Sequence, residues 1–168
     1  YIVHPSDLAP ALIALQARVR IQGPEGEREM DLASFYVHPE ERLNHETVLR
    51  PDEIVTEIFV PAPEKGTRST YLKFKEKGSM DWALSAVAAV IQSKDRRVSD
   101  VRLVLGGVAP IPWRGPDAEA ALKGKIADDP TLRSVAEIAL REAKPLSHNG
   151  FKIPLTKTLI RRAVQAIA

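Results

Sequence analysis

The segment of residues 101–114 limits most strongly what this chain can fold into. Apolar residues recur at every second position, at Val101, Leu103 and Leu105, which is the period-two pattern of a β-strand. This stretch runs directly into Gly106-Gly107, where the backbone can adopt angles closed to other residues. Pro110-Ile111-Pro112 follows and stiffens the exit. We therefore expect a strand that ends in a tight turn, and sheet partners must come from elsewhere in the chain.

Two earlier segments can supply those partners. Residues 72–75 alternate between apolar side chains and lysines, which predicts a strand. Residues 84–91 are almost entirely apolar, which is typical of a central strand covered on both faces. Residues 93–97 are polar and form a short turn, so the strands on either side of it should pair in antiparallel fashion.

Helical patterns fill the chain after the glycine pair. One short helix should open at Pro116 and end before Gly124. A second should begin at Asp129-Pro130, with Asp129 as its cap, and continue toward Pro145. A third should start near Pro154. Strands followed by segregated helices predict an α+β fold, with a small antiparallel sheet of about three strands covered by about three helices.

Residues 1–62 have a different organisation. Ser6-Asp7 should cap a short helix. Residues 18–32 should form a hairpin, and residues 54–60 should form a strand. Residues 35–51 are polar and irregular and are expected to be mostly loop. Two prolines and a glycine make residues 61–67 the best linker candidate. We therefore expect two domains, at residues 1–62 and 66–168.

Composition excludes several classes of function. The net charge is only +2 and aromatic residues make up 5%, so a nucleic-acid surface is not expected despite a pI of about 8.9. The chain has no cysteine, which excludes disulfides and a protein-held iron–sulfur cluster within this piece. No apolar run is long enough to span a bilayer. The four histidines are scattered without the spacing of a zinc site.

Several motifs, taken in order, identify a family. The chain resembles the flavin-binding medium subunit of the xanthine dehydrogenase and carbon monoxide dehydrogenase family, the molybdenum hydroxylases. The segments that carry the resemblance are His4–Leu12, Glu53-Ile54-Val55, Lys73-Phe74-Lys75, Leu103–Arg114 and Pro145–Pro154. The first of these resembles the point just after the subunit's main flavin-binding glycine motif. The resemblance implies the end of a PCMH-type FAD-binding α+β domain followed by the C-terminal domain of the subunit.

The resemblance also implies a function. FAD would be the cofactor, held together with an N-terminal half of the same subunit that is expected to precede Tyr1, since the glycine motifs are missing here. The molybdenum cofactor would lie on a large partner subunit and the iron–sulfur clusters on a small one. Such an oxidoreductase passes electrons from those clusters through FAD to an external acceptor. The segment alone would be inactive, and the implied location is cytoplasmic, with no nucleic-acid partner.

Three positions are implied as cofactor-binding, and each has a structural alternative. Asp7 would accept hydrogen bonds from cofactor hydroxyls at a helix N-terminus, but aspartate there is most often a plain cap. Lys75 would place a cation near the reduced flavin ring, but it equally fits a solvated strand face shared with Lys73. Val55 would contact the flavin through its main chain, or be an ordinary strand residue. No catalytic or metal-ligating residue is expected.

Two other functions remain open at this point. The chain could be a non-catalytic interaction domain that keeps the fold and has lost the flavin, which the missing glycine motifs would favour if the chain were complete. The hypothesis that the chain is a weak nucleic-acid binder rests on the pI alone. Flavin absorbance would separate the first of these from the flavin subunit, and salt-dependent DNA binding would support the second.

Overall fold

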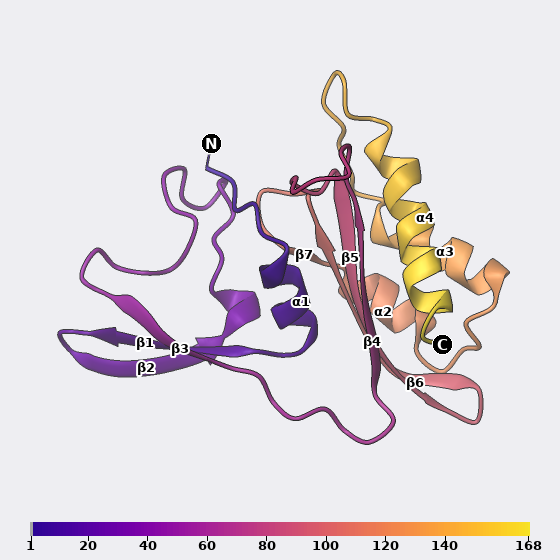
Figure 1. The fold of residues 1–168 in the computed structure, drawn as a ribbon, viewed down its shortest axis with the longest axis horizontal. Coiled ribbons are helices and arrows are strands. Elements are labelled where there is room, and N and C mark those ends of the chain that lie inside the picture. The colour runs from indigo at the N-terminus through magenta and orange to yellow at the C-terminus, as the bar shows by residue number, and fades with distance from the viewer. Residues whose placement is uncertain (1) are drawn as a thin grey trace.

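The computed structural model describes residues 2–168 and leaves out Tyr1; it contains two antiparallel sheets (Figure 1). The first sheet has the strand order β2-β1-β3, with β1 at Arg18–Gly23, β2 at Gly26–Asp31 and β3 at Ile54–Phe59. The second has the order β4-β5-β6-β7, with β4 at Arg68–Phe74, β5 at Ser85–Lys94, β6 at Arg97–Gly106 and β7 at Trp113–Arg114. The α+β class is confirmed.

The helices divide between the two faces of the second sheet. Helices α2 (Pro116–Leu122), α3 (Asp129–Ala139) and α4 (Lys152–Gln165) lie together on one side. Helix α1 (Leu8–Ala14) lies on the other side, between the two sheets (Figure 1). The strand β5 is therefore covered on both faces, as its apolar sequence predicted.

The central β5–β6 hairpin is set by its turn. Lys94 pairs with Arg97, so Asp95 and Arg96 form a two-residue loop. Both loop residues have positive φ, at 51° and 63°, which is the backbone of the turn that matches the twist of an antiparallel pair. The predicted antiparallel hairpin is confirmed.

Alternate residues of this hairpin point into two separate hydrophobic clusters. The cluster under α2, α3 and α4, here called the helix-side core, contains Val87, Ala89, Ile91, Val98, Val101, Leu103, Leu105, Ala118, Leu122, Leu132, Val135, Ala136, Leu159, Ile160, Ala163, Val164 and Ile167. The cluster on the opposite face, here called the junction core, contains Ile13, Ala14, Ala17, Val19, Ile21, Leu32, Phe35, Ala88, Val90 and Val104. The junction core joins α1 and the first sheet to the second sheet.

Three local features differ from the expectations. The short strand β7, where Trp113 pairs with Leu105, was not predicted because the prolines around it suggested only a stiff loop. The cap of α3 is Asp128, whose carboxylate accepts the Thr131 N–H at 2.9 Å, one residue before the predicted cap. The same helix ends at Ala139 rather than continuing toward Pro145.

The region between the hairpin and β3 agrees with the prediction of a loop. It holds one 3-10 turn, η1, at Leu32–Ser34 and a single bridge that joins Tyr36 to Thr47. The segment between β3 and β4 has no assigned strand or helix, as expected for the linker candidate.

Candidate functional site

Asp7 is fixed by two side chains from β4. Its Oδ2 atom lies 2.6 Å from Nζ of Lys73, and its Oδ1 accepts a hydrogen bond from the Tyr71 hydroxyl at 3.1 Å. Tyr71 and Lys73 are two residues apart in β4, so their side chains leave the same face of the strand. The N-terminal end of α1 is therefore attached to the second sheet by an ion pair and a hydrogen bond.

Lys73 also reaches the loop that joins β4 to β5. Its ammonium donates to the main-chain oxygen of Asp81 at 2.5 Å while it contacts Asp7. One charged group thus connects three separate segments of the chain. The side chain of Lys73 is 22% exposed and that of Asp7 is 41% exposed, so the pair lies at the protein surface with its carboxylate still accessible.

The electrostatics of this cluster keep Tyr71 as a hydrogen-bond donor. Burial raises the pKa of the Tyr71 hydroxyl well above its ordinary value, and the charge and hydrogen bond of Asp7 raise it further. The hydroxyl therefore stays protonated at any physiological pH and donates to the carboxylate.

Ser6, and not Asp7, provides the side-chain cap of α1. The Ser6 hydroxyl accepts the Ala9 N–H at 3.0 Å, whereas the Asp7 carboxylate makes no capping hydrogen bond. Asp7 thus occupies the N-cap position of α1, but its carboxylate is not a plain helix cap. Its carboxylate is directed at β4 instead.

The glycine pair allows α1 to approach this site. A Cβ atom at Gly106 would lie 3.2 Å from Cγ of Pro10 and 3.8 Å from the Tyr71 hydroxyl. Gly107 has a φ of 71°, and a Cβ there would lie 2.6 Å from the main-chain oxygen of Ala83. The unusual backbone expected for the glycine pair is confirmed at Gly107, and the absence of side chains at both positions lets α1 and the β4–β5 loop lie close to the end of β6.

The structure places the other two predicted site residues apart from Asp7. Lys75 follows the end of β4, is half-buried, and donates from Nζ to the main-chain oxygens of Gly78 at 3.3 Å and Ser79 at 2.6 Å. Val55 lies in the first sheet opposite Ile21 and packs, half-buried, against the junction core. The lysine that meets Asp7 is thus Lys73.

Sequence reasoning did not assign Tyr71 or Lys73 to the site. The alternation in β4 placed Lys73 and Lys75 on one face, and nothing in their spacing indicated which would face α1. The choice depends on how α1 sits on the sheet, which is a tertiary contact between residues 66 positions apart.

A separate hollow lies between the loop after β6, the loop between α3 and α4, and residues His38 and Glu40. Its volume is about 900 Å³. Two of its arginines are already paired, Arg114 with Glu119 and Arg141 with Asp117. The lining also includes Glu142, Lys144 and Lys152, so it carries charges of both signs.

No group of three or more His, Asp or Glu side chains within residues 2–168 is placed to hold a metal ion. None of the helices in this range is both long and apolar enough to cross a membrane.

Family comparisons agree with the architecture. A family model described as the CO dehydrogenase flavoprotein C-terminal domain matches residues 69–167, and one described as the FAD binding domain in molybdopterin dehydrogenase matches residues 2–63. Together these two matches define the class of molybdopterin-dehydrogenase flavoproteins. The chain belongs to the xanthine/carbon monoxide dehydrogenase family of FAD-binding subunits.

Individual relatives support the same assignment. The chain is 37% identical over 156 residues to the aldehyde oxidoreductase FAD-binding subunit PaoB of Escherichia coli, covering 92% of this chain and 45% of that protein. It is 30% identical to the carbon monoxide dehydrogenase medium chain of Hydrogenophaga pseudoflava, covering 97% of this chain and 56% of that one. The chain thus spans about half the length of these relatives.

Solved structures show the same fold. The carbon monoxide dehydrogenase of Hydrogenophaga pseudoflava that lacks the Mo-pyranopterin moiety superposes with a TM-score of 0.85 at 30% identity, over 96% of this chain and 58% of that chain. A cyanide-inactivated Cu,Mo-CO dehydrogenase gives a TM-score of 0.84 at 28% identity, over 94% and 55% of the two chains.

The residues around Asp7 fit the sugar hydroxyls of a flavin nucleotide. Each carboxylate oxygen of Asp7 holds one of the two contacts described above, so each has a lone pair left to accept another donor. A phosphate fits this cluster poorly, because Asp7 would repel it and already neutralises Lys73. The site is therefore suited to orient a hydroxyl-bearing chain and not to bind a pyrophosphate.

Proposed function

We propose that this chain is part of the FAD-binding subunit of a multi-subunit molybdenum hydroxylase. The observation that carries the proposal is the Asp7–Lys73–Tyr71 cluster, a partly exposed carboxylate held by two donors where α1 meets the second sheet. When bound, FAD would supply electron transfer between iron–sulfur clusters of a small subunit and an external acceptor. The molybdenum cofactor would lie on a large subunit.

The residues of this chain have a binding role in that scheme. Asp7 accepts hydrogen bonds from cofactor hydroxyls, and Lys73 and Tyr71 hold its carboxylate in place. Val55 contributes through its main chain, a role that suits β3 because an edge strand leaves every second residue's main-chain groups unpaired with a neighbour. Lys75 approaches the flavin ring from the β4–β5 loop.

The domain division at residues 1–62 and 66–168 belongs to the same proposal. The absence of a strand between β3 and β4, together with the two separate sheets, supports it. The N-terminal half of the subunit supplies the groups that bind the cofactor phosphates, and the proposed location of the whole enzyme is the cytoplasm.

The test uses the whole FAD-binding subunit. Asp7→Asn preserves the shape and removes the anion, and it should weaken FAD binding by roughly tenfold, the equivalent of one charged hydrogen bond of about 1.5 kcal/mol. FAD affinity is measured by titration of the apoprotein. A wild-type subunit with no flavin absorbance and no affinity for FAD would overturn the proposal in favour of an interaction domain that has lost the cofactor.

The two lysines provide a matched comparison in the same assay. Lys73→Met and Lys75→Met each keep the aliphatic stem and remove the cation. Loss of the cation near the reduced ring should lower the two-electron potential by tens of millivolts, since about 30 mV corresponds to 1.4 kcal/mol. If Lys75→Met matches wild type in both potential and FAD affinity and Lys73→Met does not, Lys75 belongs to the solvated loop and the lysine of the site is Lys73.

A further inference from the structure

Helix α1 carries Asp7 but has little stability of its own. It contains only seven residues, well below the length at which an isolated helix persists in water. Its placement therefore depends on the contacts that dock it. Lys73 and Tyr71 hold its N-terminal end on β4. The contacts at the C-terminal end of α1 therefore determine whether the whole helix, and Asp7 with it, can shift.

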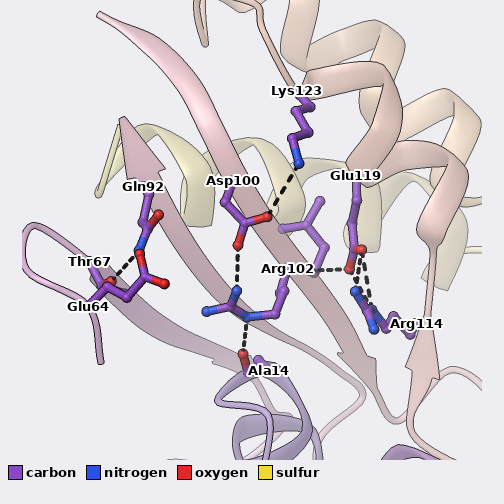
Figure 2. A network of polar contacts seen from close by, with 10 residues as sticks. Ala14, Glu64, Thr67, Gln92, Asp100, Arg102, Arg114, Glu119 and Lys123 are labelled. Atoms are coloured by element: carbon purple, nitrogen blue, oxygen red, sulfur yellow. Dashed lines mark hydrogen bonds and ion pairs between the residues drawn. The ribbon is translucent and has the colours of Figure 1, made fainter. Parts of the chain in front are cut away.

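Arg102 holds the C-terminal end. This residue of β6 points to the same side of the sheet as Val104 of the junction core, and its side chain is only 14% exposed. Its Nε donates to the main-chain oxygen of Ala14, the last residue of α1, at 2.7 Å (Figure 2). A cation at this end also complements the helix dipole.

A second contact orients the guanidinium. Nη1 of Arg102 donates to Oδ2 of Asp100, two residues earlier in β6, and Lys123 contacts the other oxygen of Asp100 at 3.9 Å (Figure 2). Because Asp100 fixes one side of the planar group, Nε is presented to Ala14 in a single orientation. The contact is therefore built into the sheet and does not depend on a flexible surface side chain.

We propose that Arg102 is a positioning residue of the cofactor site: by fixing the C-terminal end of α1 on β6, it keeps Asp7 at the opposite end in place for FAD. This inference rests on the proposed function. Arg102 does not touch the cofactor in this scheme, and it acts through α1 and Asp7.

The test is a double-mutant cycle in the whole flavin subunit. Arg102→Met keeps the stem, removes both hydrogen bonds, and should raise the dissociation constant of FAD roughly tenfold, as expected for a lost charged hydrogen bond. In the Asp7→Asn background the same change should cost little more, because both substitutions remove the same effect. Arg102→Lys, which retains a cation for the Ala14 oxygen, should recover part of the affinity.

Arg97→Met is the matched control. Arg97 lies in the same strand, and its Nη1 donates to the main-chain oxygen of Gly124, away from α1. It should leave FAD affinity unchanged. Amide hydrogen exchange of α1 should accelerate in Arg102→Met and not in Arg97→Met.

The outcomes separate the two proposals. If wild type binds FAD and Arg102→Met binds it equally well, the positioning role is wrong and the flavin function stands. Full additivity of the Asp7 and Arg102 effects also overturns the positioning role, because Arg102 would then act independently of Asp7. If wild type binds no FAD, the proposed function itself fails, and the positioning role fails with it.

Discussion

The helix-side core and the junction core lie on opposite faces of the same two strands, β5 and β6, yet they are assembled differently. Every residue of the helix-side core comes from residues 87–167. The junction core takes seven of its ten residues from positions 13–35 and only Ala88, Val90 and Val104 from the second sheet. The second half of the chain thus forms a hydrophobic core from its own residues alone, whereas the core of the first half includes residues of the second.

The contrast extends to the surfaces. Strand β3, at one edge of the first sheet, carries exposed apolar side chains at Ile54, Ile58 and Phe59, with Val60 just beyond it. The opposite edge strand, β2, is rich in charged residues, which is how edge strands usually avoid pairing. The first half therefore depends on contacts with the second, whereas the helix-side core is built from the second half alone.

The largest expected effect comes from removing a buried side chain from the helix-side core. Ile160 is fully buried in the helix-side core, so Ile160→Ala should lower the free energy of unfolding by about 2–5 kcal/mol. Ile13→Ala in the junction core should cost less, because the short helix α1 can relax into the space. Urea denaturation of both variants measures the difference. A larger loss for Ile13→Ala would reverse the proposed order of the two cores.

The glycine turn at the end of β6 should be the next most sensitive point. Gly107→Ala puts a side chain on a left-handed residue, which costs about 1–3 kcal/mol, and also drives its Cβ against the Ala83 oxygen. Gly124→Ala is the control: its φ is 79°, but a Cβ atom at this position would have nothing within 4 Å. Thermal unfolding should show a clearly larger loss for Gly107→Ala. Equal losses would mean that the contact with the β4–β5 loop relaxes freely.

Local stability should differ between the two sheets even without substitution. Amides in Val19–Ile21 should exchange at least roughly tenfold faster than those in Ala86–Val90, because the first sheet opens without disturbing the helix-side core. Native-state hydrogen exchange measures both segments in one experiment. Slower exchange in the first sheet would show that the junction core is the more stable of the two.

The smallest effect is a pH dependence confined to the first half. Hydrogen bonds from Arg28 and from the Arg50 main chain lower the pKa of Glu53 to about 2. Since this value is below that of an unfolded glutamate, about 4.3, the stabilisation is complete above about pH 4.3 and is lost as the pH falls toward 2. The loss of stability is measured as faster amide hydrogen exchange in β1 and β3 between pH 5 and pH 2, with exchange in β5 as the reference. Glu53→Gln should remove the dependence.

Much of the second half was predictable because local signals agree with its tertiary contacts. The apolar run of β5, the two-residue turn at Asp95 and Arg96, and the prolines that open α2 and α3 are short-range features. The family was likewise identified from contiguous motifs. The strand β7 escaped prediction because only two residues pair, and prolines surround them.

The site was less predictable because its contacts span the chain. The Ser6-Asp7 step looked like a cap, and the sequence could not show that Ser6 alone takes that role. The choice between Lys73 and Lys75 depended on where α1 rests, and that depends on the glycine pair and on Arg102. None of these relations produces a periodic pattern.

The contact between Arg102 and Ala14 has a consequence for the order of folding. It joins residues 88 positions apart, whereas the β5–β6 hairpin closes over two residues. Closing a long loop costs entropy that grows with the logarithm of its length, so contacts between distant residues form late unless other structure has already brought them together. We expect the β5–β6 hairpin and helices α2, α3 and α4 to fold early and to form the surface on which α1 docks. The docking of α1 would then be a late kinetic step, after which Asp7 is in place.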